Sequence, residues 1–193
     1  MAKYISDQIG NEFKEWGKNE VEFITAPTGS GKTSFVLNQL VEYAAIRGEK
    51  ILYLVNRTVL KEQIVHKIDT VIKHKLRRNP NIQNDNIERV IRVVTYQEIE
   101  SYLKSSIDTL ENWGTFRYII ADECHYFLVD SLFNTSTEIS YNWLKEQRKK
   151  STIVFMSATI FNIQKYIIKD YSLKFYENKK GASVVRGDVE IQG

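Results

Sequence analysis

Two short segments place residues capable of phosphate chemistry directly after apolar runs. The first is the glycine-rich loop APTGSGKT, from Ala26 to Thr33, between the apolar run VEFIT and a helical pattern. Gly29 and Gly31 have no Cβ atom, so the backbone can turn tightly and bring its N–H groups close to an anion. The N-terminus of the following helix adds its positive end. This loop is predicted to bind the phosphates of a nucleotide.

The side chains of this loop have distinct expected roles. Lys32 can reach the β- and γ-phosphates, and the Thr33 hydroxyl can ligate Mg²⁺. The alternative is a glycine turn before an ordinary helix, with Lys32 solvated. Ala26 stands where the general pattern has glycine, a change that several groups of phosphate-loop proteins tolerate, so the prediction stands. The residues expected to contact ATP are Thr28, Gly29, Ser30, Gly31, Lys32 and Thr33.

The second segment is Asp122-Glu123-Cys124-His125, which follows the apolar run FRYIIA. A carboxylate at the end of a buried strand, here Asp122, suits Mg²⁺, usually through water. Glu123 is placed to polarise an attacking water, and both side chains can reach one site once the chain has left the strand. The alternative is a solvated acidic turn. Cys124 is interpreted as a spacer, and His125 lacks the companions of a metal cluster. The predicted catalytic residues are Lys32, Asp122 and Glu123.

The elements that must position these residues alternate between short apolar runs and longer helical patterns. Nearly continuous apolar runs are typical of strands buried on both faces of a parallel sheet. We predict an α/β fold, a mainly parallel sheet with helices on both faces, whose ligands bind at the carboxyl ends of the strands. Strands are expected at 21–25, 50–55, 89–94, 116–121 and 152–157, helices at 33–47, 58–76, 96–103 and 161–168, and a loop at 79–86.

Length and composition agree with one cytoplasmic domain over residues 1–193. The single cysteine excludes an intramolecular disulfide framework, and no apolar run approaches the roughly 18 residues of a membrane helix. The N-terminus is too charged for a signal peptide. The net charge of +3 is too small to indicate nucleic-acid binding by itself. Residues 61–92, however, carry eight Lys or Arg and four Asp or Glu. This excess indicates either a surface for a nucleic-acid backbone or cations at a helix C-terminus.

The motifs together resemble superfamily 2 helicases, the DExD/H-box ATPases. APTGSGKT, DECH and then Ser157-Ala158-Thr159 occur in the order of that family. The segment ILYLVNRTVLKEQ, with Arg57, Leu60 and Gln63, looks like the family's motif Ia in restriction-enzyme motor subunits and related DNA helicases. VTYQ at 94–97 resembles their threonine-containing segment. The resemblance implies the N-terminal RecA-like motor domain of a DExH-box ATP hydrolase.

Further site residues are implied by this resemblance. Coupling of the nucleotide site to nucleic acid and to a second domain would fall to His125, Ser157 and Thr159. Contacts to the backbone of single-stranded DNA or RNA would fall to Arg57, Thr58 and Thr95. Helix capping is the alternative for Ser157, Thr159 and Thr95, the last with Glu98 as a capping box. Arg57 could instead be a first-turn cation. Gln8 could bind adenine, or be a surface helix residue.

The resemblance also implies a missing partner. The 34 residues after Thr159 can hold one more strand, but not a second RecA-like domain of roughly 100 residues. We therefore expect ATP–Mg²⁺ binding with poor hydrolysis, and a second motor domain in a longer chain. The alternative function is a non-motor ATP-binding module of a regulatory or transport ATPase. The motifs do not indicate the direction of movement on nucleic acid, a choice between unwinding and translocation, or the oligomeric state.

Overall fold

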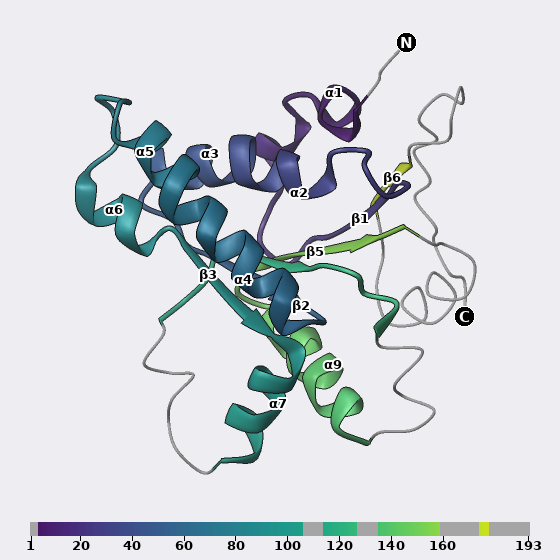
Figure 1. The fold of residues 1–193 in the computed structure, drawn as a ribbon. Helices are drawn as coiled ribbons and strands as arrows, with labels where there is room; N and C mark the ends of the chain where they lie inside the picture. The colour runs from purple at the N-terminus through teal and green to yellow at the C-terminus, as the bar shows by residue number, and fades with distance from the viewer. Residues whose placement is uncertain (1–3, 106–113, 127–134, 159–173, 178–193) are drawn as a thin grey trace.

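A parallel sheet of six strands forms the centre of the molecule, in the order β3-β2-β4-β5-β1-β6 (Figure 1). The computed structural model describes residues 4–105, 114–126, 135–158 and 174–177. The strands are β1 (Val21–Thr25), β2 (Ile51–Val55), β3 (Ile91–Thr95), β4 (Tyr118–Ala121), β5 (Thr152–Ser157) and β6 (Lys174–Glu177). The first five confirm the predicted strands to within two residues at each end, and β6 lies in the C-terminal segment that is long enough for one more strand.

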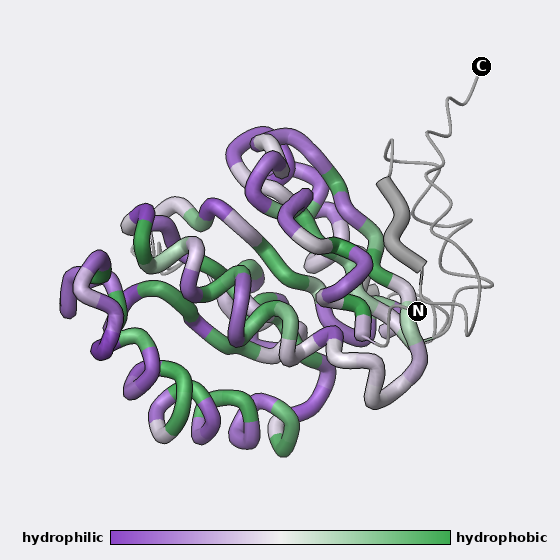
Figure 2. The backbone as a smooth tube through the Cα atoms, turned by 90° about the horizontal axis from the view of Figure 1, so that it is seen from above, coloured by the Kyte–Doolittle hydropathy of each residue, from purple (hydrophilic) through white to green (hydrophobic). Residues whose placement is uncertain are grey.

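Both faces of the sheet are covered, as predicted. In β2, Ile51, Tyr53 and Val55 belong to one apolar cluster and Leu52 and Leu54 to the other, because successive side chains of a strand point to opposite faces. Figure 2 shows hydrophobic residues along the strands and mixed residues along the helices. The part of the chain that the structure describes has no helix that combines the length and the apolar character needed to cross a membrane.

Most of the helices pack on the Tyr53 face, and α7 and α9 pack on the opposite face. Two of the predicted helices are continuous helical runs with a π-helical turn inside, from Lys32 to Ile46 and from Thr58 to Leu76. The helical segments are α1 (Ile5–Ile9), η1 (Glu12–Glu15), α2 (Lys32–Phe35), η2 (Val36–Leu40), α3 (Val41–Ile46), α4 (Thr58–Lys67), η3 (Ile68–Ile72), α5 (Lys73–Leu76), α6 (Asn84–Arg89), α7 (Tyr96–Lys104) and α9 (Thr135–Gln147).

The parallel register brings the carboxyl ends of the strands to one edge. Thr25 at the end of β1 pairs with Ser157 at the end of β5, and Val55 pairs with Thr95. The segments that follow β1, β2, β3 and β4 therefore meet at this edge, which we call the site edge. In open parallel sheets, ligands bind at this edge.

One predicted element, the loop at 79–86, is partly wrong, and another, the helix at 161–168, cannot be compared with the structure. The loop predicted at 79–86 ends early, because α6 begins at Asn84. Ile87 of α6 is buried against the core, so tertiary packing stabilises a helix that its Asn-rich sequence does not favour. The helix predicted at 161–168 lies outside the described residues.

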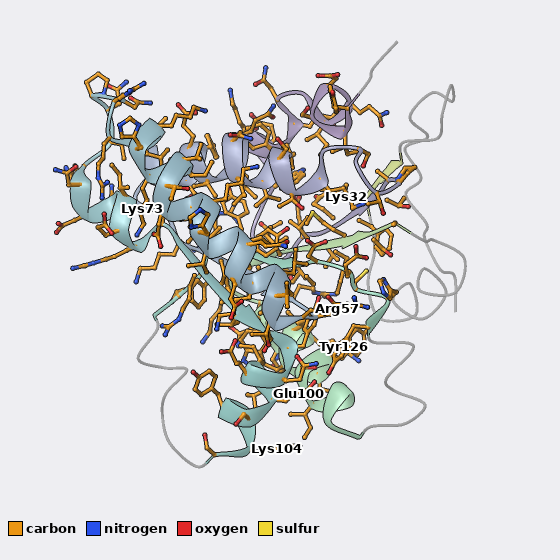
Figure 3. The ribbon with its side chains drawn as sticks, in the orientation of Figure 1. Lys32, Arg57, Lys73, Glu100, Lys104 and Tyr126 are labelled. Atoms are coloured by element: carbon orange, nitrogen blue, oxygen red, sulfur yellow. The ribbon has the colours of Figure 1, made fainter. Side chains whose placement is uncertain are left out.

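Three cations of the basic stretch, in and directly after α5, are paired with carboxylates of the protein. α4 starts at the site edge and the helical run leads back across the sheet, so α5 lies at the far edge from Lys32 (Figure 3). There Lys73 and Arg77 both bond to Glu88, at 2.9 and 2.6 Å, and Lys75 bonds to Glu42 at 2.9 Å. These bonds raise the pKa of Lys73 and lower the pKa values of Glu88 and Glu42. The structure therefore supports helix-end cations here, not a nucleic-acid surface at the strand ends.

Candidate nucleotide site and nucleic-acid edge

The phosphate loop has the backbone that its glycines predict. Gly29 and Gly31 have φ values of 81° and 90°, in the left-handed region that residues with a Cβ rarely adopt. Gly31 is the N-cap of α2, so the loop passes directly into the helix. The Ala26 N–H donates to the Ser157 carbonyl at 3.1 Å, and the Ile5 N–H donates to the Ser30 carbonyl at 3.0 Å. The loop is thus tied to β5 on one side and to α1 on the other.

Lys32 lies inside this loop, where its side chain is bonded to the backbone. It is only 8% exposed, and its Nζ donates to the Ala26 carbonyl at 2.5 Å and to the Pro27 carbonyl at 3.4 Å. Burial lowers the pKa of Lys32, while the negative charges of Asp122 and Glu123 act in the opposite direction. The structure therefore brings these three predicted catalytic residues into electrostatic contact, and it excludes the solvated lysine of the alternative interpretation.

Asp122 is buried, and hydrogen bonds hold both its main chain and its side chain. Its N–H donates to the Leu54 carbonyl at 3.0 Å, and its own carbonyl accepts from the Tyr96 hydroxyl at 2.8 Å. Its Oδ2 accepts from the Tyr53 hydroxyl at 2.7 Å, and its Oδ1 accepts from the Glu123 N–H at 2.9 Å. Burial raises the pKa of Asp122, and the Tyr53 hydrogen bond partly opposes this. A buried carboxylate with this electrostatic cost is suited to a cation.

The chain leaves β4 through an unusual turn at Glu123. Its φ of 50° is positive, a left-handed conformation that costs a residue with a Cβ on the order of 1–2 kcal/mol. Because the chain turns here, the side chain of Glu123 is not forced to the face of the sheet opposite Asp122. Oε2 of Glu123 lies 3.1 Å from Nδ1 of His125. Cys124 is fully buried, which raises its pKa well above the ordinary thiol value and suits a spacer rather than a nucleophile.

The predicted coupling residues are only partly described. His125 is half-buried beside Glu123, and Ser157 is fully buried at the end of β5. Thr159 lies outside the described residues. His125 and Ser157 therefore flank the site, and their coupling roles remain predictions.

The nucleic-acid residues differ in how much of them is accessible. Arg57 is the exposed N-cap residue of α4, and Thr58 is exposed in its first turn (Figure 3). A cation is unfavourable at a helix N-terminus, so stabilisation of the helix does not explain Arg57. Thr95 is the N-cap of α7: its hydroxyl accepts from the Glu98 N–H at 3.1 Å, and its N–H donates to Glu98 at 2.7 Å. The capping box of the alternative interpretation is present, although the Thr95 hydroxyl proton can still donate.

Gln8 lies in α1, next to the phosphate loop. α1 packs on α2, and a Cβ on Gly31 would be 3.4 Å from the ring of Tyr4. Among the described residues, the Gln8 side-chain oxygen and the Ser30 hydroxyl are buried without a hydrogen-bond partner. Two unpartnered polar atoms beside the loop are what a bound ligand would explain.

Sequence reasoning missed a set of buried polar side chains behind the Asp122 turn. The ring of Tyr126 stacks on Tyr96 at 4.7 Å, and its hydroxyl donates to Glu100 at 3.2 Å. The Ser140 hydroxyl donates to the same carboxylate oxygen at 3.1 Å. These contacts join the turn after β4 to α7 and α9. The only signal in the sequence is polar residues within otherwise apolar patterns, which does not reveal their partners.

The fold is that of a RecA-like α/β domain with a phosphate loop, of the ATP-dependent helicase-like motor class. The family model described as type III restriction enzyme, res subunit, matches residues 2–162, and the chain belongs to this family. The match confirms the resemblance drawn from the motifs. A comparison with individual curated proteins gives no match.

Proposed function

We propose that this chain is the ATP-binding N-terminal domain of a DExH-box helicase or translocase. The observation that carries the proposal is the convergence of Lys32 of the phosphate loop with Asp122 and Glu123 after β4. Lysine, aspartate and glutamate in this arrangement suit the binding and hydrolysis of a nucleoside triphosphate. Family membership and the exposed Arg57 on the same edge support nucleic acid as the partner.

The residues of the site fit ATP and Mg²⁺. The left-handed glycines shape the loop for phosphate oxygens, and the Lys32 ammonium now bonded to loop carbonyls would move onto the β- and γ-phosphates. Thr33 and Asp122 would hold the Mg²⁺, which neutralises charge on the phosphates. Both oxygens of Asp122 already accept a protein hydrogen bond, which favours contact through a water.

Glu123 is proposed as the residue that polarises the attacking water. Its backbone turn keeps the carboxylate near Lys32 while leaving it partly exposed, and one of its oxygens lies 3.1 Å from Nδ1 of His125. A general base of this kind contributes roughly 10²–10⁴-fold to a rate. We further propose that hydrolysis requires arginine fingers from a second RecA-like domain, because such a residue contributes about 10³–10⁵-fold in phosphoryl transfer.

The nucleotide assignment is tested with Lys32→Ala. The variant loses charge-assisted hydrogen bonds to phosphate and should bind a fluorescent ATP analogue about tenfold to a hundredfold more weakly. Lys67→Ala, at an exposed position of α4, is the matched control and should bind normally. Circular dichroism verifies that both variants fold. Unchanged ATP affinity in folded Lys32→Ala would falsify the assignment.

The motor assignment is tested separately with nucleic acid. In the full-length protein, single-stranded DNA or RNA should raise the rate of ATP hydrolysis or the affinity for ATP. If neither changes while ATP still binds, the chain is better described as a non-motor ATP-binding module, the alternative named from the sequence. Running DNA and RNA in parallel also identifies the class of nucleic acid.

A further inference from the structure

Tyr53 places a single polar atom beside the candidate metal ligand Asp122. It is the central residue of β2, fully buried, in the otherwise apolar run ILYLV. A buried tyrosine hydroxyl requires a hydrogen-bond partner, and that of Tyr53 donates to Oδ2 of Asp122 at 2.7 Å. This hydroxyl group therefore contacts the carboxylate that is assigned to the metal.

The contact restricts how the Asp122 carboxylate can turn. Oδ1 is held by the Glu123 N–H at 2.9 Å and Oδ2 by Tyr53, so both ends of the carboxylate are fixed. Each oxygen keeps a further lone pair for a metal-bound water. Without the Tyr53 hydroxyl, the carboxylate could rotate about its Cβ–Cγ bond, and Oδ2 would lose its protein donor in a buried environment.

We propose that Tyr53 is a positioning residue that orients the Asp122 carboxylate for the magnesium ion of the bound nucleotide. This inference rests on the proposed function and adds a residue to it. Tyr53 acts on the metal only through the Asp122 carboxylate, to which its hydroxyl is bonded. Hydrogen-bond partners of metal-binding carboxylates commonly have this effect, and their loss typically costs about 10–100-fold in metal affinity or activity.

Tyr96 provides a matched control within the same protein. It is also fully buried, and its hydroxyl also bonds to Asp122, at 2.8 Å, but to the main-chain carbonyl rather than to the carboxylate. Tyr53→Phe and Tyr96→Phe therefore remove the same group from the same neighbour. They differ in whether the carboxylate loses its donor.

The experiment measures the affinity of a fluorescent ATP analogue with Mg²⁺ and with EDTA, for the native protein and both variants. The ratio of the two affinities is the Mg²⁺-dependent gain. Tyr53→Phe should reduce this gain about 10–100-fold while leaving the affinity in EDTA unchanged. Tyr96→Phe should keep the gain, even where its melting temperature falls as much as that of Tyr53→Phe.

A double variant verifies that Tyr53 acts through Asp122. Asp122→Asn alone and Asp122→Asn combined with Tyr53→Phe should show the same residual Mg²⁺-dependent gain. The asparagine amide is neutral, so the double variant does not leave a buried negative charge without the Tyr53 donor. Any one of three results would overturn the proposal. The Mg²⁺-dependent gain could be unchanged in Tyr53→Phe, it could fall equally in Tyr96→Phe, or it could be lower in the double variant than in Asp122→Asn. If native protein binds ATP with no Mg²⁺-dependent gain, the metal assignment itself fails; if the gain exists and Tyr53→Phe keeps it, only the role of Tyr53 fails.

Discussion

Arg57 and Arg77 cap the two ends of one helical run, Arg57 before α4 and Arg77 after α5. Because the run crosses the face of the sheet, the two guanidinium groups belong to opposite edges. Arg77 donates to Glu88 at 2.6 Å, whereas Arg57 lies exposed where the run leaves the site edge. The same residue type thus has a structural partner at one edge and faces solvent at the edge that carries the nucleotide site.

This difference predicts the response of nucleic-acid binding to mutation. Arg57→Ala should weaken binding of single-stranded nucleic acid and reduce the slope of log affinity against log salt by about 0.7, the value for one lost phosphate contact. Arg77→Ala, with its charge already paired, should leave both quantities unchanged. Titrations at several salt concentrations measure both. Equal losses in the two variants would mean that the charge of the domain, and not the position of Arg57, determines affinity.

Thr95 is predicted to contribute to stability through the N-cap of α7. Thr95→Ala removes the hydroxyl that accepts from the Glu98 N–H and should cost about 1 kcal/mol. For a chain of this size, that lowers the melting temperature by roughly 2–4 °C. Thr95→Ser keeps the cap and should be near native. Calorimetry or thermal circular dichroism would detect the difference.

Glu98→Ala distinguishes capping from nucleic-acid contact at this position. It removes the other half of the capping box, and the 2.5 Å ion pair with Lys61, while the Thr95 hydroxyl remains. Stability should fall in both variants. A loss of nucleic-acid affinity in Thr95→Ala that is absent from Glu98→Ala would show that the hydroxyl also donates to a phosphate.

Glu123→Gln should separate binding from hydrolysis. The amide keeps the size of the side chain but cannot accept a proton, so ATP should bind with native affinity while turnover falls roughly 10²–10⁴-fold. Glu62→Gln, on the exposed surface of α4, serves as the control. The measurement is nucleic-acid-stimulated phosphate release by the full-length protein. Native turnover in Glu123→Gln would require a different residue to activate the water.

The pairing of Glu42 with Lys75 predicts a dependence of stability on pH. The Lys75 hydrogen bond lowers the pKa of Glu42 in the folded protein, so the unfolded state takes up the proton first as the pH falls. The stabilisation is therefore complete above the unfolded pKa and is lost as the pH falls through the folded pKa. Glu42→Gln should be less stable than native by about 0.2–1 kcal/mol at pH 7, with the difference vanishing in acid. A difference independent of pH would exclude the ion pair as its cause.

The fold was largely predictable because β1, β2, β4 and β5 are buried on both faces. Such strands are apolar throughout, so VEFIT and TIVFMS give the limits of β1 and β5 directly. The phosphate loop was equally readable, since its glycines are required by the left-handed backbone. α6 was missed because packing of Ile87, and not local propensity, stabilises it.

The site was less predictable where it depends on contacts through space. Tyr53 reads as one apolar residue of a strand, and its bond to Asp122 joins positions 69 residues apart. Similarly, the sequence alone shows a basic patch in α5, because Glu42 and Glu88, which pair with its lysines, come from other helices. Sequence spacing indicates what a residue can do, but which partner it meets depends on the crossovers of the sheet.

The strand order also bears on how the domain is made. Among the described strands, β1 pairs with β5 and β6, and Val21 of β1 lies opposite Ile153 of β5. Because these pairings are parallel, no two of the described strands form a local hairpin. At a synthesis rate of about 5–20 residues per second, β5 is completed on the order of ten seconds after the phosphate loop has been made. The nucleotide site is therefore expected to form late in folding, and to be assembled only when the chain has been made through Ser157.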